Sequence, residues 1–381
     1  SVTFYGYAFE GCTGVTSVYL TMGNGTMPNM DYENTKKDAT PWHASHENEI
    51  HIVLEDGITQ IGSYAFCGCS GLKTIELPGT ITYIGPAAFS GCSALESSVI
   101  PETVTSIGTG AFRNCSALTT ITVPDGIASI QHDTFANCSG LTSVTMPCSA
   151  TIEEDAFAGC TSIAFVRLTK GTGKIPGYDS YYSPRYTDTP WYASQADTLI
   201  VTLDEGIETI GRNAFRDSRL TEITIPSSVT SISAESVFIG CRSLRKITVH
   251  EDNSYYAGVD GILFSKDMTK LICYPAARPG TSFHLPSEVE TIYASAFCDC
   301  RLLTEFTVSE ENQNYCAKDG VLFTVDMSKL VVYPCGNLQS AYTVPDGVST
   351  IGKYAFYNCT ALTAIAIPES TSLIEQYAFY G

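Results

Sequence analysis

The chain has few positive charges. Its 381 residues include 21 Lys and Arg against 40 Asp and Glu, so the formal net charge at pH 7 is −19. A charge of this sign opposes phosphate backbones and anionic lipid surfaces. We therefore expect no nucleic-acid partner.

The sequence also lacks any run of about 20 apolar residues, the length that a membrane-spanning helix needs. We expect no membrane insertion, and because no basic and apolar leader precedes Ser1, we expect a mature or trimmed chain. Apolar residues make up 44% of the chain and charged residues only 16%. This composition excludes a disordered acidic tail and a coiled coil, and it allows a large core.

Motifs that carry catalysis or bind cofactors are missing too. Gly-x-Ser-x-Gly, His-Glu-x-x-His and EF-hand loops do not occur, and residues 171–174 lack the rest of a phosphate-binding loop. His43 and His46 are the only closely spaced histidines, and a metal site would need a third and a fourth ligand. We predict no enzymatic activity, no cofactor and no metal site.

The sequence does contain a repeat built around phenylalanine. Most neighbouring copies are 22 or 23 residues apart, and four links are longer by 34 to 36 residues. Repetition at a fixed period of this length is typical of solenoids. The phenylalanines that share the repeat phase are Phe9, Phe66, Phe89, Phe112, Phe135, Phe157, Phe215, Phe238, Phe297, Phe356 and Phe379.

Residues 107–124 show the chemistry of one 23-residue unit. Leu118, Ile121 and Val123 alternate with Thr120 and Thr122, which predicts a short strand with apolar side chains inward and hydroxyls outward. Two residues after each Phe stands Gly, Asn or Asp, the residues that tolerate a left-handed backbone. One coil cannot enclose a core, so successive coils should stack with Phe over Phe and strand beside strand.

The repeat resembles the BspA-like leucine-rich-repeat proteins, bacterial and protozoan surface proteins whose coils look like IGxxAFxxCxxLxxIxIP. The match recurs in phase and covers nearly the whole chain. It is clearest at residues 61–78, 84–101, 107–124, 130–147 and 351–368. The resemblance implies a β-rich solenoid, a right-handed superhelix or horseshoe with a parallel sheet on one face, and a cell-surface role in adhesion or host contact.

We predict a single solenoid over residues 1–381, with insertions at about 21–55, 169–204, 251–276 and 310–336. The insertions at 251–276 and 310–336 each contain two β-rich runs joined by a polar turn, which predicts a hairpin that continues or flanks the main sheet. The insertions at 21–55 and 169–204 carry the only two tryptophans, Trp42 and Trp191, at equivalent places. These rings either stack on a sugar or anchor a partner, or they pack as lids over a solenoid edge, and repetition in register favours the lid.

We place the candidate ligand site in the inserted loops, because binding residues concentrate in loops. The stretch around residues 178–186 has the mixture of Tyr and Ser that is typical of binding surfaces. The predicted ligand-binding residues are Trp42, Tyr178, Tyr181, Tyr182, Tyr186, Trp191 and Tyr192. The outward strand positions, mostly Thr, offer a second surface on the order of 50 to 70 Å long that needs no ligand to explain it.

Nine of the 15 cysteines share one repeat phase, three residues after Phe. Parallel Cβ vectors disfavour the disulfide torsion, so we predict buried free thiols along the stack. The sequence as a whole favours a non-enzymatic recognition or adhesion module, extracellular or at the cell surface, with a protein or glycan surface as its partner. The alternative is a structural spacer that presents an enzyme or anchor elsewhere in a larger surface protein.

Overall fold

The computed structural model describes residues 16–20, 25–27, 29, 49–178, 185–233 and 236–381. Over these ranges the protein is a β-solenoid of stacked parallel strands with almost no helix, as the repeat predicts. The described helices are two short ones, η3 (Tyr186–Asp188) and α1 (Pro190–Ala193). The chain divides into two compact units, Ser1–Ile207 and Glu208–Gly381. A single solenoid over 1–381 stays a prediction.

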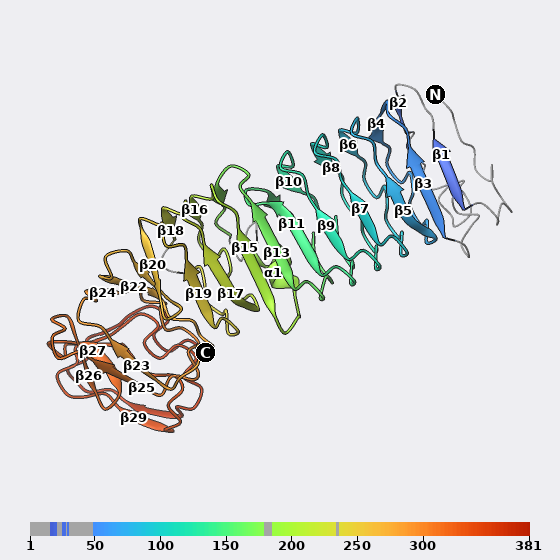
Figure 1. Cartoon of the computed structure of the whole chain (residues 1–381). Coiled ribbons are helices and arrows are strands. Elements are labelled where there is room, and N and C mark those ends of the chain that lie inside the picture. The colour runs from blue at the N-terminus through green and yellow to red at the C-terminus, as the bar shows by residue number, and fades with distance from the viewer. Residues whose placement is uncertain (1–15, 21–24, 28, 30–48, 179–184, 234–235) are drawn as a thin grey trace. The chain divides into compact units, whose positions relative to one another are not determined.

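The first unit contains a ladder of parallel strands, one from each coil, that lie side by side in Figure 1. Each strand hydrogen-bonds to the strand of the next coil, so sequence neighbours in this ladder are also spatial neighbours. The strands are β1 (Ser17–Leu20), β3 (Ile50–Leu54), β5 (Leu72–Glu76), β7 (Ser97–Val99), β9 (Thr120–Thr122), β11 (Ser143–Pro147), β13 (Phe165–Thr169) and β15 (Leu199–Leu203).

Each coil also contributes a shorter strand before its Phe. In the first unit β2, β4, β6 and β8 form one parallel sheet, and β10 pairs with β12. The bounds are β2 (Gly25–Thr26), β4 (Ile58–Ile61), β6 (Tyr83–Ile84), β8 (Ser106–Ile107), β10 (Ser129–Ile130), β12 (Thr151–Ile152) and β14 (Lys174–Ile175).

The second unit repeats this plan with two hairpin modules. Its long strands pair in parallel as β17 (Leu220–Ile225) with β19 (Lys246–Val249), β23 (Ser282–Leu285) with β25 (Glu305–Val308), and β29 (Ala341–Thr343) with β31 (Ala364–Ala366). Its short strands are β16 (Thr209–Ile210), β18 (Ser231–Ile232), β24 (Thr291–Ile292), β30 (Thr350–Ile351) and β32 (Leu373–Ile374).

The core of the first unit is a column of stacked phenylalanine rings. Phe112 is completely buried, with its ring centre 5.1 Å from that of Phe89 and 5.6 Å from that of Phe135. The column continues to Phe66 and to Phe157 at 5.2 and 5.3 Å. Stacking of Phe over Phe is therefore confirmed, and the rings bury large apolar areas that no single coil could cover.

Tight corners hold this column in place. The residue two positions after Phe is left-handed in the described coils, for example Asn114 with φ 61° and Asn137 with φ 61°. The backbone N–H of Asn114 donates to Ala136 O of the next coil at 2.8 Å, and the Asn137 side chain donates to Asn114 Oδ1 at 3.0 Å. The predicted corner is confirmed, and the bond between the two Asn side chains links neighbouring corners.

A second left-handed residue precedes the ring in many coils, and the repeat pattern did not predict it. It lies two positions before Phe and is often not glycine: Tyr64 has φ 59° and Ala87 has φ 50°. Such a conformation costs a non-glycine residue about 1 kcal/mol or more. The N–H of Ala87 donates to Thr109 O of the next coil at 2.9 Å, which helps to offset that cost.

The two hairpin modules are confirmed, but they join the short-strand sheet rather than the main sheet. In the first module β20 (Tyr256–Val259), β21 (Ile262–Ser265) and β22 (Lys270–Cys273) are antiparallel, and β22 pairs in parallel with β24. The second module has the same order, with β26 (Tyr315–Lys318), β27 (Val321–Thr324), β28 (Lys329–Val332) and then β30. Asp260 and Gly261 both have positive φ and form the turn between β20 and β21.

Each module also packs a tyrosine ring against the phenylalanine of the coil that follows it. Tyr274 lies 23 residues before Phe297, and the two ring centres are 5.5 Å apart. Tyr333 relates to Phe356 in the same way, at 5.2 Å. The insertion is therefore a modified coil in which Tyr replaces Phe.

A buried asparagine attaches each module to the preceding coil. Asn253 is fully buried and donates to Pro226 O and Val229 O at 2.8 and 3.0 Å, while its Oδ1 accepts the N–H groups of Tyr255 and Tyr256 at 2.8 Å. Four hydrogen bonds satisfy the whole amide, as a buried polar group requires.

The equivalent residue of the second module, Asn312, lies 59 positions later and makes the same kinds of bond. It donates to Pro286 O at 2.8 Å and to Val289 O at 3.1 Å, and its Oδ1 accepts from Tyr315 N at 2.8 Å. Neither asparagine is predicted by the repeat, although Asn253 and Asn312 each lie 15 residues after a Phe of the repeat, and this shared spacing is the signal.

Candidate functional site

The outward side chains of the main sheet in the first unit form continuous rows, and one of these rows takes a single side chain from each strand. Cross-strand register sets this order, because each residue lies directly opposite its neighbour. The outer row consists of Ser17, His51, Thr74, Ser97, Thr120, Ser143, Phe165 and Ile200.

Most of the outer row is polar. His51 Nδ1 lies 2.7 Å from Thr74 Oγ1, and Ser97, Thr120 and Ser143 continue the series of hydroxyls. These residues are exposed or half-buried, as predicted for the outward positions. Thr and Ser are ordinary residues for a solvated strand face and point to no particular ligand.

The row changes character at β13 and β15. Phe165 is 53% exposed and lies opposite Ile200, which is half-buried. We call these two residues the apolar pair. Beside it on the same face, Arg167 Nε and Nη2 donate to the two carboxylate oxygens of Asp204 at 2.9 and 3.0 Å. This ion pair raises the pKa of Arg167, so the guanidinium stays charged.

The insertion at residues 169–204 attaches to the chain just before β13. Ser194, directly after α1, donates its hydroxyl to Ile163 O at 2.6 Å, and Gln195 N donates to Thr161 O at 2.8 Å. Pro190 at the first position and a β-region Thr189 before it define the start of this short helix. The insertion is thus anchored next to the strand that carries Phe165.

Two of the predicted ligand-binding aromatics are inside this insertion. Trp191 is 1% exposed and Tyr178 is 3% exposed, and their rings meet edge to face with centres 6.2 Å apart. Burial also raises the pKa of Tyr178, which keeps its hydroxyl neutral. Neither ring has a face open to a ligand, and the packing fits the lid interpretation of Trp191.

The other predicted site residues divide into two groups. Tyr192, on α1, is 41% exposed, in contrast to Tyr178 and Trp191. Tyr186 belongs to η3. Trp42, Tyr181 and Tyr182 lie outside the described residues, and a ligand-binding role for the set as a whole stays a prediction.

The cysteines of the described coils carry free thiols. The Sγ of Cys115 donates to Phe89 O at 3.2 Å, and that of Cys138 donates to Phe112 O at 3.1 Å, each reaching into the preceding coil. Burial raises the pKa of the Cys241 thiol to about 12. Neutral thiols of this kind are poor nucleophiles, so they serve packing.

The described part of the chain contains neither a metal-ligand cluster nor a membrane-spanning helix. Among the residues that the structure places, no three His, Cys, Asp or Glu side chains gather in a way that suits a metal ion. His43 and His46 lie outside those residues. The described helices are too short and too polar to cross a bilayer.

Comparison with known families decides the classification. The family described as the BspA type leucine rich repeat region matches the chain in six copies, over residues 44–164, 194–259, 273–318 and 326–381, which is more than half of its length. The chain belongs to the BspA-type leucine-rich repeat family. This agrees with the solenoid fold and with the resemblance drawn from the repeat.

Solved structures similar to this BspA-type protein are themselves leucine-rich repeat proteins. A leucine-rich cell surface protein from Faecalibacterium prausnitzii A2-165 is 22% identical, with 92% of this chain and 87% of the other covered and a TM-score of 0.36. A leucine-rich repeat protein from Bacteroides ovatus ATCC 8483 is 19% identical, with 98% and 90% covered and a TM-score of 0.40. No curated protein matches the BspA-type chain.

Proposed function

We propose that this protein is a non-enzymatic recognition module, extracellular or at the cell surface, that binds a protein or glycan surface through the outer face of its first unit. The observation that carries the proposal is the apolar pair. Phe165 and Ile200 occupy positions that six other strands fill with Ser, Thr or His.

The apolar pair is informative because it departs from the residues that the other coils place at the same positions. The coils share one backbone, so a hydroxyl at either position would satisfy the fold, as Thr120 and Ser143 do in their own coils. The contact of Phe165 with Ile200 adds at most about 1 kcal/mol of stability, and local departures from a repeat concentrate at functional positions. Aromatic side chains are also enriched at the centres of binding interfaces.

The surroundings of the pair suit an extended partner. The row of hydroxyls on one side offers hydrogen bonds, while the anchored insertion next to β13 presents the exposed Tyr192. An apolar centre with a polar margin is the usual composition of protein interfaces, and aromatic rings beside hydroxyls also suit sugars.

The test is a screen of the purified chain on matrix-protein and glycan arrays, followed by affinity measurements on the hits. Phe165→Ser/Ile200→Thr should lower affinity at least tenfold, since it removes the exposed apolar area. Thr120→Ser, in the same row, is the matched control and should change affinity less than twofold. Unchanged melting curves would show that the double variant still folds.

Two results would count against the proposal. Equal binding by the parent and the double variant would remove the apolar pair from the interface. Absence of any hit for the parent would favour the alternative of a structural spacer, whose surface needs no partner.

A further inference from the structure

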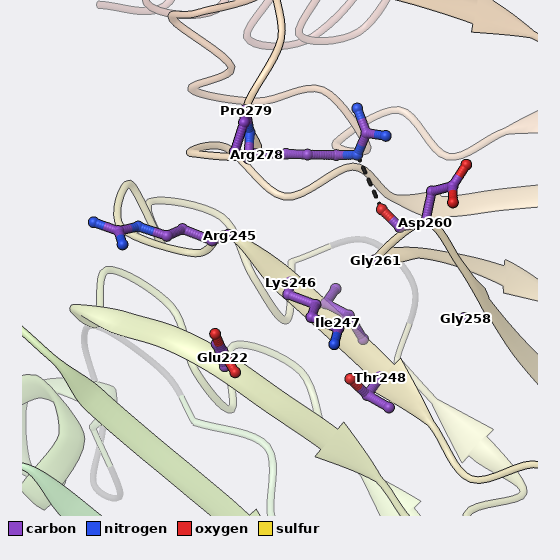
Figure 2. Close-up of a pocket in the computed structure, with 10 residues that line it drawn as sticks. All are labelled: Glu222, Arg245, Lys246, Ile247, Thr248, Gly258, Asp260, Gly261, Arg278 and Pro279. Atoms are coloured by element: carbon purple, nitrogen blue, oxygen red, sulfur yellow. Dashed lines mark hydrogen bonds between the residues drawn. The ribbon is translucent and has the colours of Figure 1, made fainter.

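The second unit contains a groove beside strand β19 (Figure 2). Its volume is about 590 Å³, and its walls come from the outer face of β17 and β19 and from the turn between β20 and β21. Three basic residues line it: Arg245 and Lys246 at the start of β19, and Arg278 after β22. We call this the cationic groove. Three cations around one groove stand out in a chain where acidic residues outnumber basic ones almost two to one.

Contacts to the protein fix the Arg278 side chain at the rim of the groove. Its Nε donates to Asp260 O at 3.0 Å, its Nη1 to the Tyr274 hydroxyl at 3.3 Å, and the guanidinium lies 5.4 Å from the centre of the Tyr274 ring. A guanidinium held in place loses little conformational freedom when it binds an anion.

The other two cations are exposed and form no ion pair with a described residue. Two carboxylates line the groove as well. Glu222 lies opposite Lys246 in the sheet register, and Asp260 directs its carboxylate away from Lys246 (Figure 2). Neither carboxylate forms an ion pair with a lining cation within 4.0 Å, and three cations against two carboxylates leave the lining with a net positive charge.

The second hairpin module provides an internal comparison. Its equivalent positions, 59 residues later, hold Thr304, Glu305 and Asn337 in place of Arg245, Lys246 and Arg278. Both modules nevertheless have the same strand order and the same positive-φ turn. A module of this kind therefore forms without the three cations, although Arg278 adds hydrogen bonds within the first module. The surplus of cations distinguishes the first module from the second and favours a binding role.

We propose that the cationic groove binds an acidic saccharide, with a carboxylate or sulfate group held by Arg245, Lys246 and Arg278. Arg offers paired N–H donors that match both groups, and Lys adds a compact charge. Thr248, also in the lining, supplies a hydroxyl for the sugar. This site lies in the other unit from the apolar pair and goes beyond the function proposed above.

A peptide partner fits the groove less well. Peptides commonly add to a free strand edge or insert apolar side chains into a groove. Here the Ile247 N–H already donates to Gly261 O at 2.8 Å, which closes the edge of β19 at that point. Ile247 is itself buried, so Pro279 is the exposed apolar side chain of the lining.

Calorimetry on the full chain tests the proposal with four probes of similar length. The probes are a sulfated heparin hexasaccharide, hexagalacturonate, the neutral cellohexaose and hexaglutamate. We expect the chain to bind at least one of the two acidic saccharides, one per chain, with affinity that falls as salt rises, and not to bind cellohexaose. The sulfated and carboxylated probes distinguish the two sources of negative charge.

Variants assign the binding to the groove. Arg245→Gln/Lys246→Gln should lower affinity at least tenfold, and Arg278→Gln should act in the same direction. Lys266→Gln/Lys270→Gln removes two exposed cations from another turn of the same module and should change affinity less than twofold. Phe165→Ser should leave this binding unchanged, which separates it from the proposed function of the first unit.

Introducing the three cations at the equivalent positions of the second module should create a second binding site. Thr304→Arg/Glu305→Lys/Asn337→Arg should raise the number of saccharides bound per chain from one to two. The proposal is overturned if neither acidic saccharide binds, if the Lys266/Lys270 control loses as much affinity as the groove variant, or if hexaglutamate binds at least as tightly with the same dependence on the groove. Tight hexaglutamate binding would instead assign the groove to acidic peptides.

Discussion

Replacing Phe112 by Ala tests the aromatic column most directly. The ring has no exposed surface and stacks on Phe89 at 5.1 Å and Phe135 at 5.6 Å, so its removal leaves a cavity that two neighbouring coils border. Buried Phe to Ala changes lower stability by about 3 to 5 kcal/mol. For a cooperative unit of roughly 200 residues, each kcal/mol corresponds to about 2 to 4 °C, which predicts a melting temperature about 6 to 20 °C lower.

The matched control is Phe165→Ala, the same chemical change at a ring that is 53% exposed. Together with Thr122→Ala on the outer face, it should alter stability by less than about 1 kcal/mol, because little buried surface is lost. Urea unfolding followed by circular dichroism measures all three variants. Equal destabilisation by Phe112→Ala and the two surface variants would refute the assignment of inward and outward positions.

Three further predictions concern the second unit. The Tyr333 hydroxyl is buried without a hydrogen-bond partner, whereas the Tyr274 hydroxyl accepts from Arg278, so in thermal melts Tyr333→Phe should be neutral or stabilising by about 1 kcal/mol and Tyr274→Phe destabilising. Asn253→Asp should destabilise at least as much as Asn253→Ala in urea unfolding, because a carboxylate cannot donate to two backbone carbonyls, and a milder effect of Asp would contradict the four-bond arrangement. Burial raises the pKa of Cys241 to about 12, so the unfolded chain loses the thiol proton at a lower pH than the folded chain. The contribution of the neutral thiol to the free energy of unfolding is therefore fully present below the unfolded pKa, about 8.5, and is lost as the pH rises to about 12. Cys241→Ala should flatten the fall of unfolding free energy over that range by about 1.4 kcal/mol per pH unit, and an unchanged slope would argue against burial of a neutral thiol.

The regular coils could be predicted from the sequence because each buried or exposed position recurs in many coils with the same kind of residue. Phe112, Ile121 and Thr122 each recur in phase, so period and chemistry together define inside and outside. The hairpin modules were harder, since Tyr274 replaces Phe and the spacing of 23 residues from Phe297 is visible only once Tyr counts as part of the column.

The candidate site was less predictable for a physical reason. Amphipathic rings such as Trp191 and Tyr178 suit both a ligand and a lid, and the choice depends on burial that sequence does not report. Phe165 carried a readable signal, because it occupies a phase that Ser143 and Thr120 fill with hydroxyls. Departures from a repeat are therefore more informative about binding than residues of a binding type.

The same reasoning connects the two proposed surfaces. A solenoid of near-identical coils supplies backbone geometry equally to every coil, so differences between coils carry whatever recognition the molecule has. In the first unit the difference is the exposed ring of Phe165, and in the second it is the set of Arg245, Lys246 and Arg278 that the second module lacks. An apolar centre and a cationic groove select different chemical groups, so one array screen with both sets of variants should lose different hits in each set.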